Sequence, residues 1–194
     1  RDLHSFPTRR SSDLGEGGCA FCAGDGGRAR HLSSGQDVQA QVKAGVEYVR
    51  RRYNAEPPYA AYFQSFTNTN AGADTLRRLY GEALSLSDFK AVIIATRPDC
   101  IPDDTLDLLS ELSESYELWV ELGVQTAHDR TLQLGNRGHD FACVETAALR
   151  LAERGLKTAA HMILGLPGET PDDFIQTAKR IAALPFSGVK VHNL

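Results

Sequence analysis

From residue 35 onward, the hydrophobic positions of the chain follow two alternating periods. Apolar residues three or four apart predict helices over residues 38–53, 76–84, 102–112, 140–154 and 170–184. Short runs rich in apolar and aromatic residues predict strands over residues 59–67, 91–96, 117–126, 156–165 and 187–194. Strands that alternate with helices in this way are typical of βαβ units. The pattern therefore predicts an α/β fold with a parallel sheet, either a barrel or a doubly wound sheet.

One face of the predicted strands is unexpectedly polar. In the strand over residues 117–126, one face is apolar and suits packing under helices, while the other carries Glu121 and Gln125. The polar residues expected on this second face are Gln64, Glu121, Gln125, His161, Lys190 and His192. Burying such groups without partners costs roughly several kcal/mol each. A wide or incomplete barrel that binds a ligand in its lumen explains all of them together, although any single one also fits a hydrogen-bonded core residue.

The ends of the predicted strands carry further candidate residues. The segments "ATRPD" at 95–99, "GVQT" at 123–126, "GLPGE" at 165–169 and "HN" at 192–193 all lie where strands finish. In parallel α/β folds, the carboxyl ends of the strands hold the active site. Gly165 and Gly168 allow a backbone to approach a ligand closely, or simply make a tight turn. The sequence thus predicts a ligand site at this rim.

Two cysteines, Cys19 and Cys22 in "GGCAFC", are spaced as metal ligands. A zinc ion or an iron–sulfur cluster usually takes three or four protein ligands, and the chain has only Cys100 and Cys143 besides. A thioredoxin-like dithiol is disfavoured because the glycines that follow Cys22 would break a helix there. Cys100 and Cys143 are interpreted as small buried hydrophobic residues.

Composition excludes several classes of protein. The chain has 194 residues, of which 42% are hydrophobic and 24% charged, which is ordinary for a folded domain. No apolar run reaches the roughly 18 residues of a membrane helix, and no secretory signal is visible, so we expect no membrane partner and a cytoplasmic location. The net charge of −4 gives no support for a nucleic-acid surface, without excluding a local basic groove.

The first fourteen residues, "RDLHSFPTRRSSDL", have no helical or strand period. They match the in-frame translation of a short-read sequencing-library adapter at every position. We therefore expect residues 1–14 to be an adapter-derived, disordered segment and exclude them from the fold. The authentic sequence is expected to begin near Gly15.

Five segments in order, "GGCAFC", "TRPDC", "ELGVQTAHD", "NRGHDF" and "GLPGE", resemble the radical S-adenosylmethionine enzymes. The resemblance covers about residues 15–194 and is strongest to an uncharacterised bacterial branch related to the catalytic subunit of the elongator complex. It implies a partial core domain over 15–194 with an incomplete (β/α)6 TIM-like barrel, truncated at both ends and lacking the first strand. It also implies a [4Fe–4S] cluster that cleaves S-adenosylmethionine reductively, so that a substrate hydrogen is abstracted.

The resemblance also suggests roles for individual residues. Cys19 and Cys22 would be cluster ligands, with the third cysteine of the family falling near position 7, inside the adapter. Arg137 would pair with the carboxylate of S-adenosylmethionine. The other residues expected to bind this cofactor are Phe21, Ile163 and Gly165 near the adenine, Glu121 and Gln125 near the ribose and methionine, Gln64 and Thr67 in place of a missing "GGE" segment, and His192. No catalytic residue is assigned.

Partners and alternatives follow from the same resemblance. The expected partners are a substrate that is either RNA or a small molecule, and an electron donor such as flavodoxin or ferredoxin. With two thiolates in place of three, the chain itself is expected to hold a labile cluster and to be inactive. The alternative is a non-catalytic structural module that binds zinc or an iron–sulfur cluster.

Overall fold

The protein, in a computed structural model, is described at Ala20 and at residues 36–194. The helices of this part are α1 (Val38–Tyr53), α2 (Ala73–Leu84), α3 (Asp103–Ser115), α4 (Asp129–Leu134), α5 (Phe141–Glu153) and α6 (Pro171–Ala182), with a short 3₁₀ helix at Pro98–Cys100. The strands are β1 (Tyr59–Phe63), β2 (Phe89–Thr96), β3 (Glu117–Gln125), β4 (Lys157–Leu164) and β5 (Gly188–Asn193). Strands and helices alternate along the chain, as predicted.

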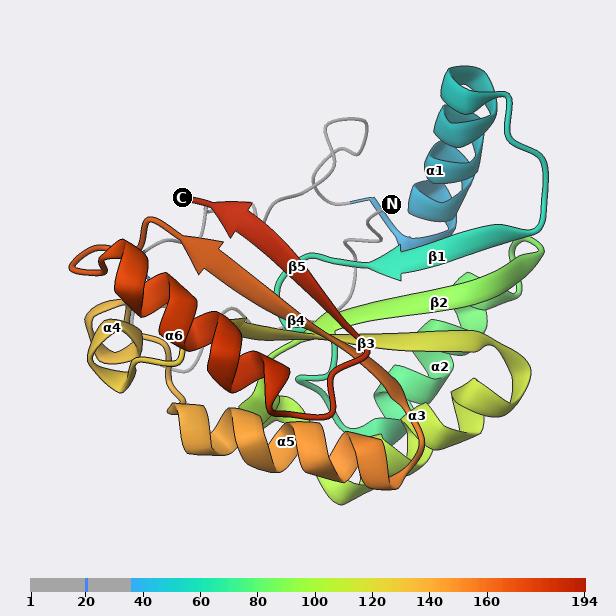
Figure 1. The fold of residues 1–194 in the computed structure, drawn as a ribbon. Helices are drawn as coiled ribbons and strands as arrows, with labels where there is room; N and C mark the ends of the chain where they lie inside the picture. The colour runs from blue at the N-terminus through green and yellow to red at the C-terminus, as the bar shows by residue number, and fades with distance from the viewer. Residues whose placement is uncertain (1–19, 21–35) are drawn as a thin grey trace.

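The strands form one sheet in which every neighbouring pair is parallel. Their spatial order is β1-β2-β3-β4-β5, so each strand lies beside its predecessor in the sequence. Helices α2, α3, α5 and α6 cover one face of this sheet, and α1 stands beside β1 (Figure 1). This is the arrangement of an incomplete parallel β/α barrel, which confirms the predicted fold class.

The helix-covered face of the sheet carries the hydrophobic core. Val92 and Ile94 of β2, with Val120 and Leu122 of β3, have no exposed surface. They pack with Leu109 and other apolar residues of the helices in one cluster. The alternation predicted for the strand over 117–126 is therefore confirmed, and the opposite, polar face of the sheet is left for other uses.

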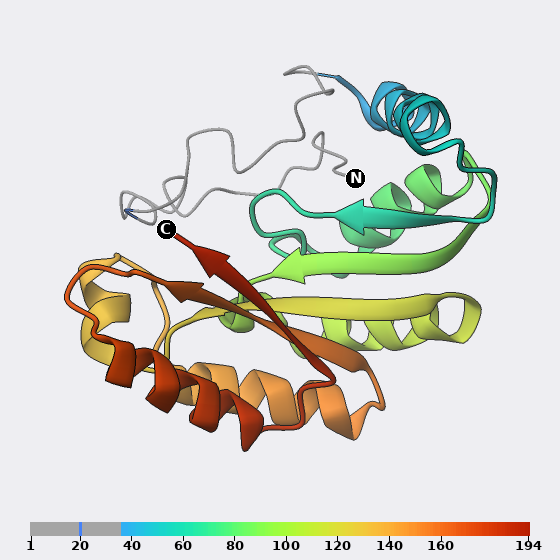
Figure 2. The same ribbon diagram turned by 45° about the horizontal axis from the view of Figure 1, so that its top comes forward.

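The sheet is strongly curled, so that its two edge strands approach each other over the polar face. In a flat sheet, β1 and β5 would lie four strand spacings apart, or roughly 19 Å. Yet the Lys190 ammonium on β5 donates a hydrogen bond of 2.7 Å to the Tyr62 hydroxyl on β1. Figure 2 shows β5 crossing obliquely over the neighbouring strands. The polar face is thus the concave side of a half-barrel.

The end of the first strand differs from the sequence-based expectation, and the last strand is more exposed than its neighbours. The strand expected over 59–67 ends at Phe63, because Phe66 adopts a left-handed backbone (φ 60°) and turns the chain. The Asn68 side-chain amide stabilises this turn by donating to the carbonyls of Phe63 and Ala95. On β5, Val189 and Val191 are 52% and 56% exposed, so no helix of the described part covers them.

Helix α4 was not predicted. It has six residues, too few for a hydrophobic period to be visible in the sequence. The Asp129 carboxylate at its start accepts a hydrogen bond of 2.8 Å from the backbone N–H of Phe141, which ties α4 to the start of α5. No helix in the described part of the chain is long and apolar enough to cross a membrane.

Candidate functional site at the carboxyl ends of the strands

A buried arginine, Arg137, lies at the carboxyl end of β3. Only 6% of the surface of this residue is exposed. One Nη2–H donates to the Gly123 carbonyl at 2.9 Å, and Nε–H donates to Nε2 of His139 at 3.1 Å. The guanidinium is therefore held at the rim by groups from both β3 and its own loop.

His139 is suited to this contact because it is neutral. Burial, and then the positive charge of Arg137, lower the pKa of His139 to about 4. Its Nδ1 lies 3.2 Å from the Asp140 carbonyl, so Nδ1 carries the proton and Nε2 accepts from Arg137. A protonated imidazole would have no acceptor to offer at this position.

Gly123 is required for the close approach of Arg137 to β3. A Cβ at this position would overlap Nη2 of Arg137 and would come within 2.9 Å of Nε2 of Gln125. Gln125 itself is buried and has a left-handed backbone (φ 70°), where the pairing of β3 with β4 shifts register. The strand end is thus shaped so that the glutamine amide and the guanidinium lie side by side.

A second buried arginine, Arg97, supports the same loop from the end of β2. Nε of Arg97 donates to the Asp99 carboxylate at 2.8 Å, and the Nη2 atom makes a second, shorter contact with this carboxylate. Gly138 packs directly on the guanidinium, since a Cβ there would lie 2.6 Å from Nη2. The "TRPD" and "NRGH" segments, far apart in the sequence, therefore form one structure at the rim.

Ala20, which lies between Cys19 and Cys22 in the sequence, contacts the loop that carries Arg137. The backbone N–H of Ala20 donates to the Gly135 carbonyl at 3.0 Å. Cys19 and Cys22, together with Phe21, lie outside the described residues. Among the described residues, no group of three or more His, Cys, Asp or Glu side chains could hold a metal ion.

The middle of the concave face carries a hydrogen-bonded group of four side chains, which we call the lumen cluster: Tyr62, Glu121, His161 and Lys190. Oε2 of Glu121 accepts from the Tyr62 hydroxyl, from His161 Nε2 at 2.6 Å and from Lys190 Nζ at 3.5 Å. Burial alone would raise the pKa of Glu121, but the hydrogen bonds from His161 and Tyr62 lower it to about 2. The predicted inward direction of Glu121, His161 and Lys190 is confirmed.

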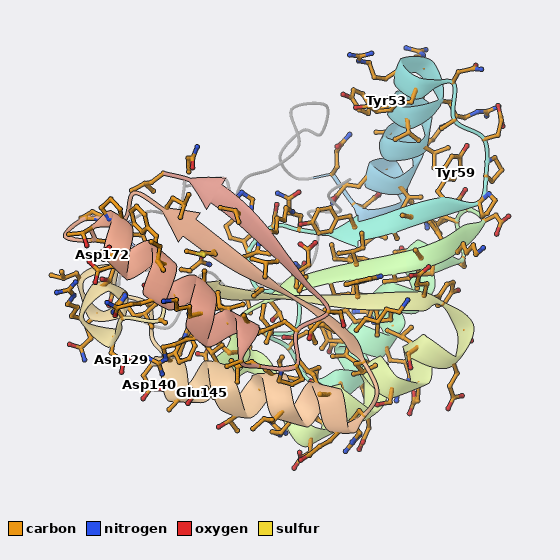
Figure 3. All side chains as sticks on the ribbon, viewed as in Figure 1. Tyr53, Tyr59, Asp129, Asp140, Glu145 and Asp172 are labelled. Atoms are coloured by element: carbon orange, nitrogen blue, oxygen red, sulfur yellow. The ribbon has the colours of Figure 1, made fainter. Side chains whose placement is uncertain are left out.

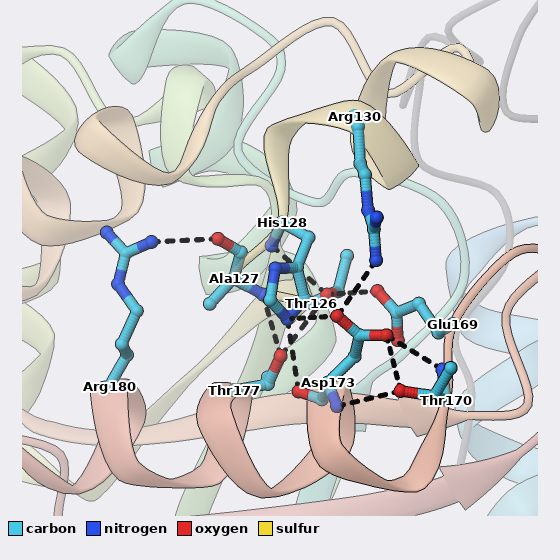
Figure 4. Close-up of polar contacts among 9 residues, drawn as sticks. All are labelled: Thr126, Ala127, His128, Arg130, Glu169, Thr170, Asp173, Thr177 and Arg180. Atoms are coloured by element: carbon cyan, nitrogen blue, oxygen red, sulfur yellow. Dashed lines mark hydrogen bonds and ion pairs between the residues drawn. The ribbon is translucent and has the colours of Figure 1, made fainter.

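The turn after β4 is tied to the end of β3 by a polar network (Figure 4). The Thr126 hydroxyl, next to Gln125 in sequence, donates to Glu169 of the "GLPGE" segment and lies 3.2 Å from the Thr177 hydroxyl of α6. Asp173 of α6 accepts from Arg130 at 2.8 Å. Gly165 and Gly168 both have positive φ, so the tight turn expected there is confirmed.

The remaining predicted residues are distributed around the same face. Gln64 is half-buried and Thr67 is buried in the turn after β1, while Ile163 is half-buried at the end of β4. His192 is exposed, and its ring centroid lies 5.2 Å from that of His161. The structure thus gathers these residues at one end and one face of the sheet, and their roles toward a cofactor stay predictions.

Some residues at the rim were not assigned from the sequence. Arg97, Asp99 and His139 lie in segments that the sequence analysis quotes, but their contacts depend on loops that meet only in the fold. In contrast, the labelled acidic side chains Asp129, Asp140 and Glu145 lie on the side of α4 to α6, outside the concave face (Figure 3). Cys100 and Cys143 are free, half-buried thiols, and burial raises the pKa of both.

Comparison with known proteins shows which family the chain belongs to. The model of the Radical SAM superfamily matches residues 15–181. Protein YhcC of Escherichia coli K12 is 40% identical over 189 residues, covering 95% of this chain and 59% of YhcC. YtqA of Bacillus subtilis 168 is 40% identical over 185 residues, covering 95% of this chain and 57% of YtqA. The chain therefore spans less than two thirds of these relatives.

More distant relatives share part of the sequence or the fold. The tRNA uridine(34) acetyltransferase of Methanocaldococcus infernus is 34% identical over 80 residues, which is 41% of this chain and 14% of that protein. Among solved structures, an Elp3 from the same archaeon has a TM-score of 0.68 at 22% identity, covering 81% of this chain and 42% of its own. AdoMet-bound anSMEcpe has a TM-score of 0.58 at 17% identity, covering 90% of this chain and 47% of its own. TsrM of Kitasatospora setae, solved with cobalamin and a [4Fe–4S] cluster, has a TM-score of 0.55 at 18% identity, covering 82% and 29%.

Proposed function

Because the chain belongs to the radical S-adenosylmethionine superfamily, as its family match and relatives establish, we propose that it is part of an enzyme that binds a [4Fe–4S] cluster and S-adenosylmethionine at this rim. Cys19 and Cys22 would be ligands of the cluster. The alternative, a non-catalytic structural module that binds zinc or an iron–sulfur cluster, is not favoured by the family match. A [4Fe–4S] cluster is bound in TsrM and AdoMet is bound in anSMEcpe, two proteins of similar fold, which supports this pair of cofactors here.

One observation carries the proposal: the segment of the two cysteines and the segment of Arg137 meet. Ala20, which directly follows Cys19 in sequence, is hydrogen-bonded to Gly135, two residues before Arg137. S-adenosylmethionine presents a carboxylate and an amine that must lie close to the cluster for both to bind one iron. The contact between Ala20 and Gly135 supports this arrangement, because it connects the segment of the two cysteines to the loop that carries Arg137.

The residues of the rim fit the cofactor chemically. The Arg137 guanidinium suits a carboxylate, and Gln125 offers an amide beside it. Gly165, with φ 87°, lets the backbone approach the adenine closely, next to Ile163. Phe21, Gln64, Thr67, Glu121 and His192 are proposed to complete the cofactor site, as the sequence predicts.

When bound, the reduced cluster would supply the electron that cleaves S-adenosylmethionine, and the cleaved cofactor would abstract a hydrogen from the substrate. The chain's own residues bind and orient. Arg137, fixed by Gly123 and His139, holds one end of the cofactor, and the Thr126–Glu169 contact holds the "GLPGE" turn against the end of β3. The electron donor is proposed to be a flavodoxin or ferredoxin.

RNA is the substrate class that the relatives support best. One of the similar proteins is a tRNA uridine(34) acetyltransferase, and we propose RNA modification for the whole enzyme on that basis. We also propose that residues 1–14 replace native sequence that supplied the third cluster ligand. A chain in which this segment is replaced by one carrying a cysteine at position 7 should hold a more stable cluster.

The cofactor site is tested by the affinity for S-adenosylmethionine after anaerobic cluster reconstitution, measured by equilibrium dialysis. Arg137→Met should weaken binding about tenfold or more, because the carboxylate loses its charged partner. Arg137→Lys keeps the positive charge but lacks the paired N–H donors of a guanidinium, so its affinity should lie between those of the unchanged chain and Arg137→Met. This second variant provides a result even if Arg137→Met does not fold. Arg154→Met removes an exposed arginine paired with Asp107 and serves as the control. Equal affinity in Arg137→Met, Arg137→Lys and the control would refute the assignment of the site.

A further inference from the structure

The lumen cluster lies well below the rim. Glu121 precedes Gln125 by four residues on β3, and a strand advances by about 3.3 Å per residue, so the two side chains are separated by roughly 13 Å along the strand. The Lys190–Tyr62 hydrogen bond joins the two edge strands over the same level. The cluster therefore lies on the concave face of the sheet, below the rim.

The charges within the cluster are unevenly satisfied. Oε2 of Glu121 receives a short hydrogen bond from the Tyr62 hydroxyl and one of 2.6 Å from His161. The Lys190 ammonium has its close contact, 2.7 Å, with the neutral Tyr62 hydroxyl and reaches the carboxylate only at 3.5 Å. A charge-assisted hydrogen bond of full strength is about 2.7–2.9 Å long. Lys190 is thus a half-buried cation whose nearest carboxylate is mainly engaged by other donors.

Neighbouring groups on the concave face also favour an anionic ligand. An ammonium has three donors, and Lys190 contacts Tyr62 and Glu121, so one donor remains for a further acceptor. His192, two residues along β5, lies beside His161 and is exposed. Partial burial of the ring, and then the positive charges of His161 and Lys190, lower the pKa of His192, and its imidazole still has an N–H to donate. A metal ion would be repelled by the Lys190 ammonium, so the lumen cluster does not suit a cation.

We propose that Lys190, with His192, binds an anionic group of the substrate, a carboxylate or a phosphate, on the concave face of the half-barrel below the rim. The Tyr62 hydroxyl holds Lys190 in place before the substrate arrives, and the Glu121 carboxylate competes weakly with the anion for the ammonium. The assignment of this anion to the substrate rests on the proposed function. The binding of an anion by Lys190 does not depend on it. Lys190 has no proposed role toward the cofactor, whereas Glu121 and His192 are also among the residues proposed for the cofactor, so the two proposed sites adjoin.

The test is an NMR titration of the chain without cluster or S-adenosylmethionine, so that failure of the cofactor assignment leaves it intact. The His161 and His192 Cε1–H resonances are followed at pH 7.5 and constant ionic strength while inorganic phosphate, or separately acetate, replaces chloride. We expect saturable shifts of both resonances. Tighter binding of phosphate would identify a phosphate-bearing substrate, and tighter binding of acetate a carboxylate-bearing one.

Three variants separate an anion site from a merely structural cluster. Lys190→Met should weaken binding about fivefold or more, and Lys190→Arg should retain it. Glu121→Gln should strengthen binding severalfold, because it removes the competing negative charge, whereas a structural role predicts weakening. Lys157→Met is the matched control, since Lys157 also pairs with a glutamate, Glu117, at the other end of the same face. Shifts that do not saturate with either anion, equal losses in Lys190→Met and Lys157→Met, or weakening by Glu121→Gln would overturn the proposal.

Discussion

At the scale of single residues, the rim depends on places where a side chain is missing. Gly123 leaves room for the Arg137 guanidinium, and Gly138 leaves room for that of Arg97. Without these glycines, two buried arginines could not lie against the backbone at the ends of adjacent strands. The sequence shows the glycines, but their purpose is visible only once Arg137, fourteen residues beyond Gly123, has folded back onto it.

Gly123→Ala tests this packing. The added methyl group would displace Arg137 or Gln125, so we expect a loss of about 1–3 kcal/mol in the free energy of unfolding, measured by urea denaturation. Gly81→Ala, in helix α2 with nothing within 4 Å of the new methyl, is the control and should be neutral or stabilising by up to about 1 kcal/mol. A Gly123→Ala protein as stable as the Gly81→Ala protein would show that the close approach is not required.

At the scale of elements, most of what the sequence predicts is confirmed because it is local. Thr170 was predicted from its sequence context to begin helix α6, and its hydroxyl accepts from the N–H of Asp173 while the Asp173 carboxylate accepts from the N–H of Thr170. The predicted end of strand β1 is wrong, and helix α4 is not predicted at all. The end of β1 is set by Asn68 binding a carbonyl of β2, and α4 by Asp129 binding the start of α5, and both are contacts with distant segments.

Removing the cap of α6 should therefore destabilise the protein measurably. Thr170→Ala leaves the first turn of the helix without its side-chain acceptor, and we expect a loss of about 1 kcal/mol in the free energy of unfolding. Thr146→Ala serves as the comparison, because its hydroxyl only donates to a carbonyl within helix α5 and is exposed. Thermal denaturation of the two variants side by side checks this, and equal melting temperatures would contradict the capping role.

At the scale of the whole molecule, curling of the sheet makes the candidate site. The period of each strand predicts which side chains face inward, and Glu121, His161 and Lys190 are found there as expected. That Lys190 meets Tyr62 was beyond the sequence, because the two residues are 128 positions apart and belong to opposite edges of the sheet. The same curl surrounds the concave face on which the cofactor and substrate sites are proposed.

The most direct test of the whole account is the electron paramagnetic resonance spectrum of the reduced, reconstituted protein with and without S-adenosylmethionine, recorded on the chain that carries a cysteine at position 7. We predict a [4Fe–4S] signal that S-adenosylmethionine shifts, that Cys100→Ser retains and that Cys19→Ser loses. A signal that survives in Cys19→Ser, or one that S-adenosylmethionine leaves unchanged, would contradict the assignment of this rim as the cofactor site.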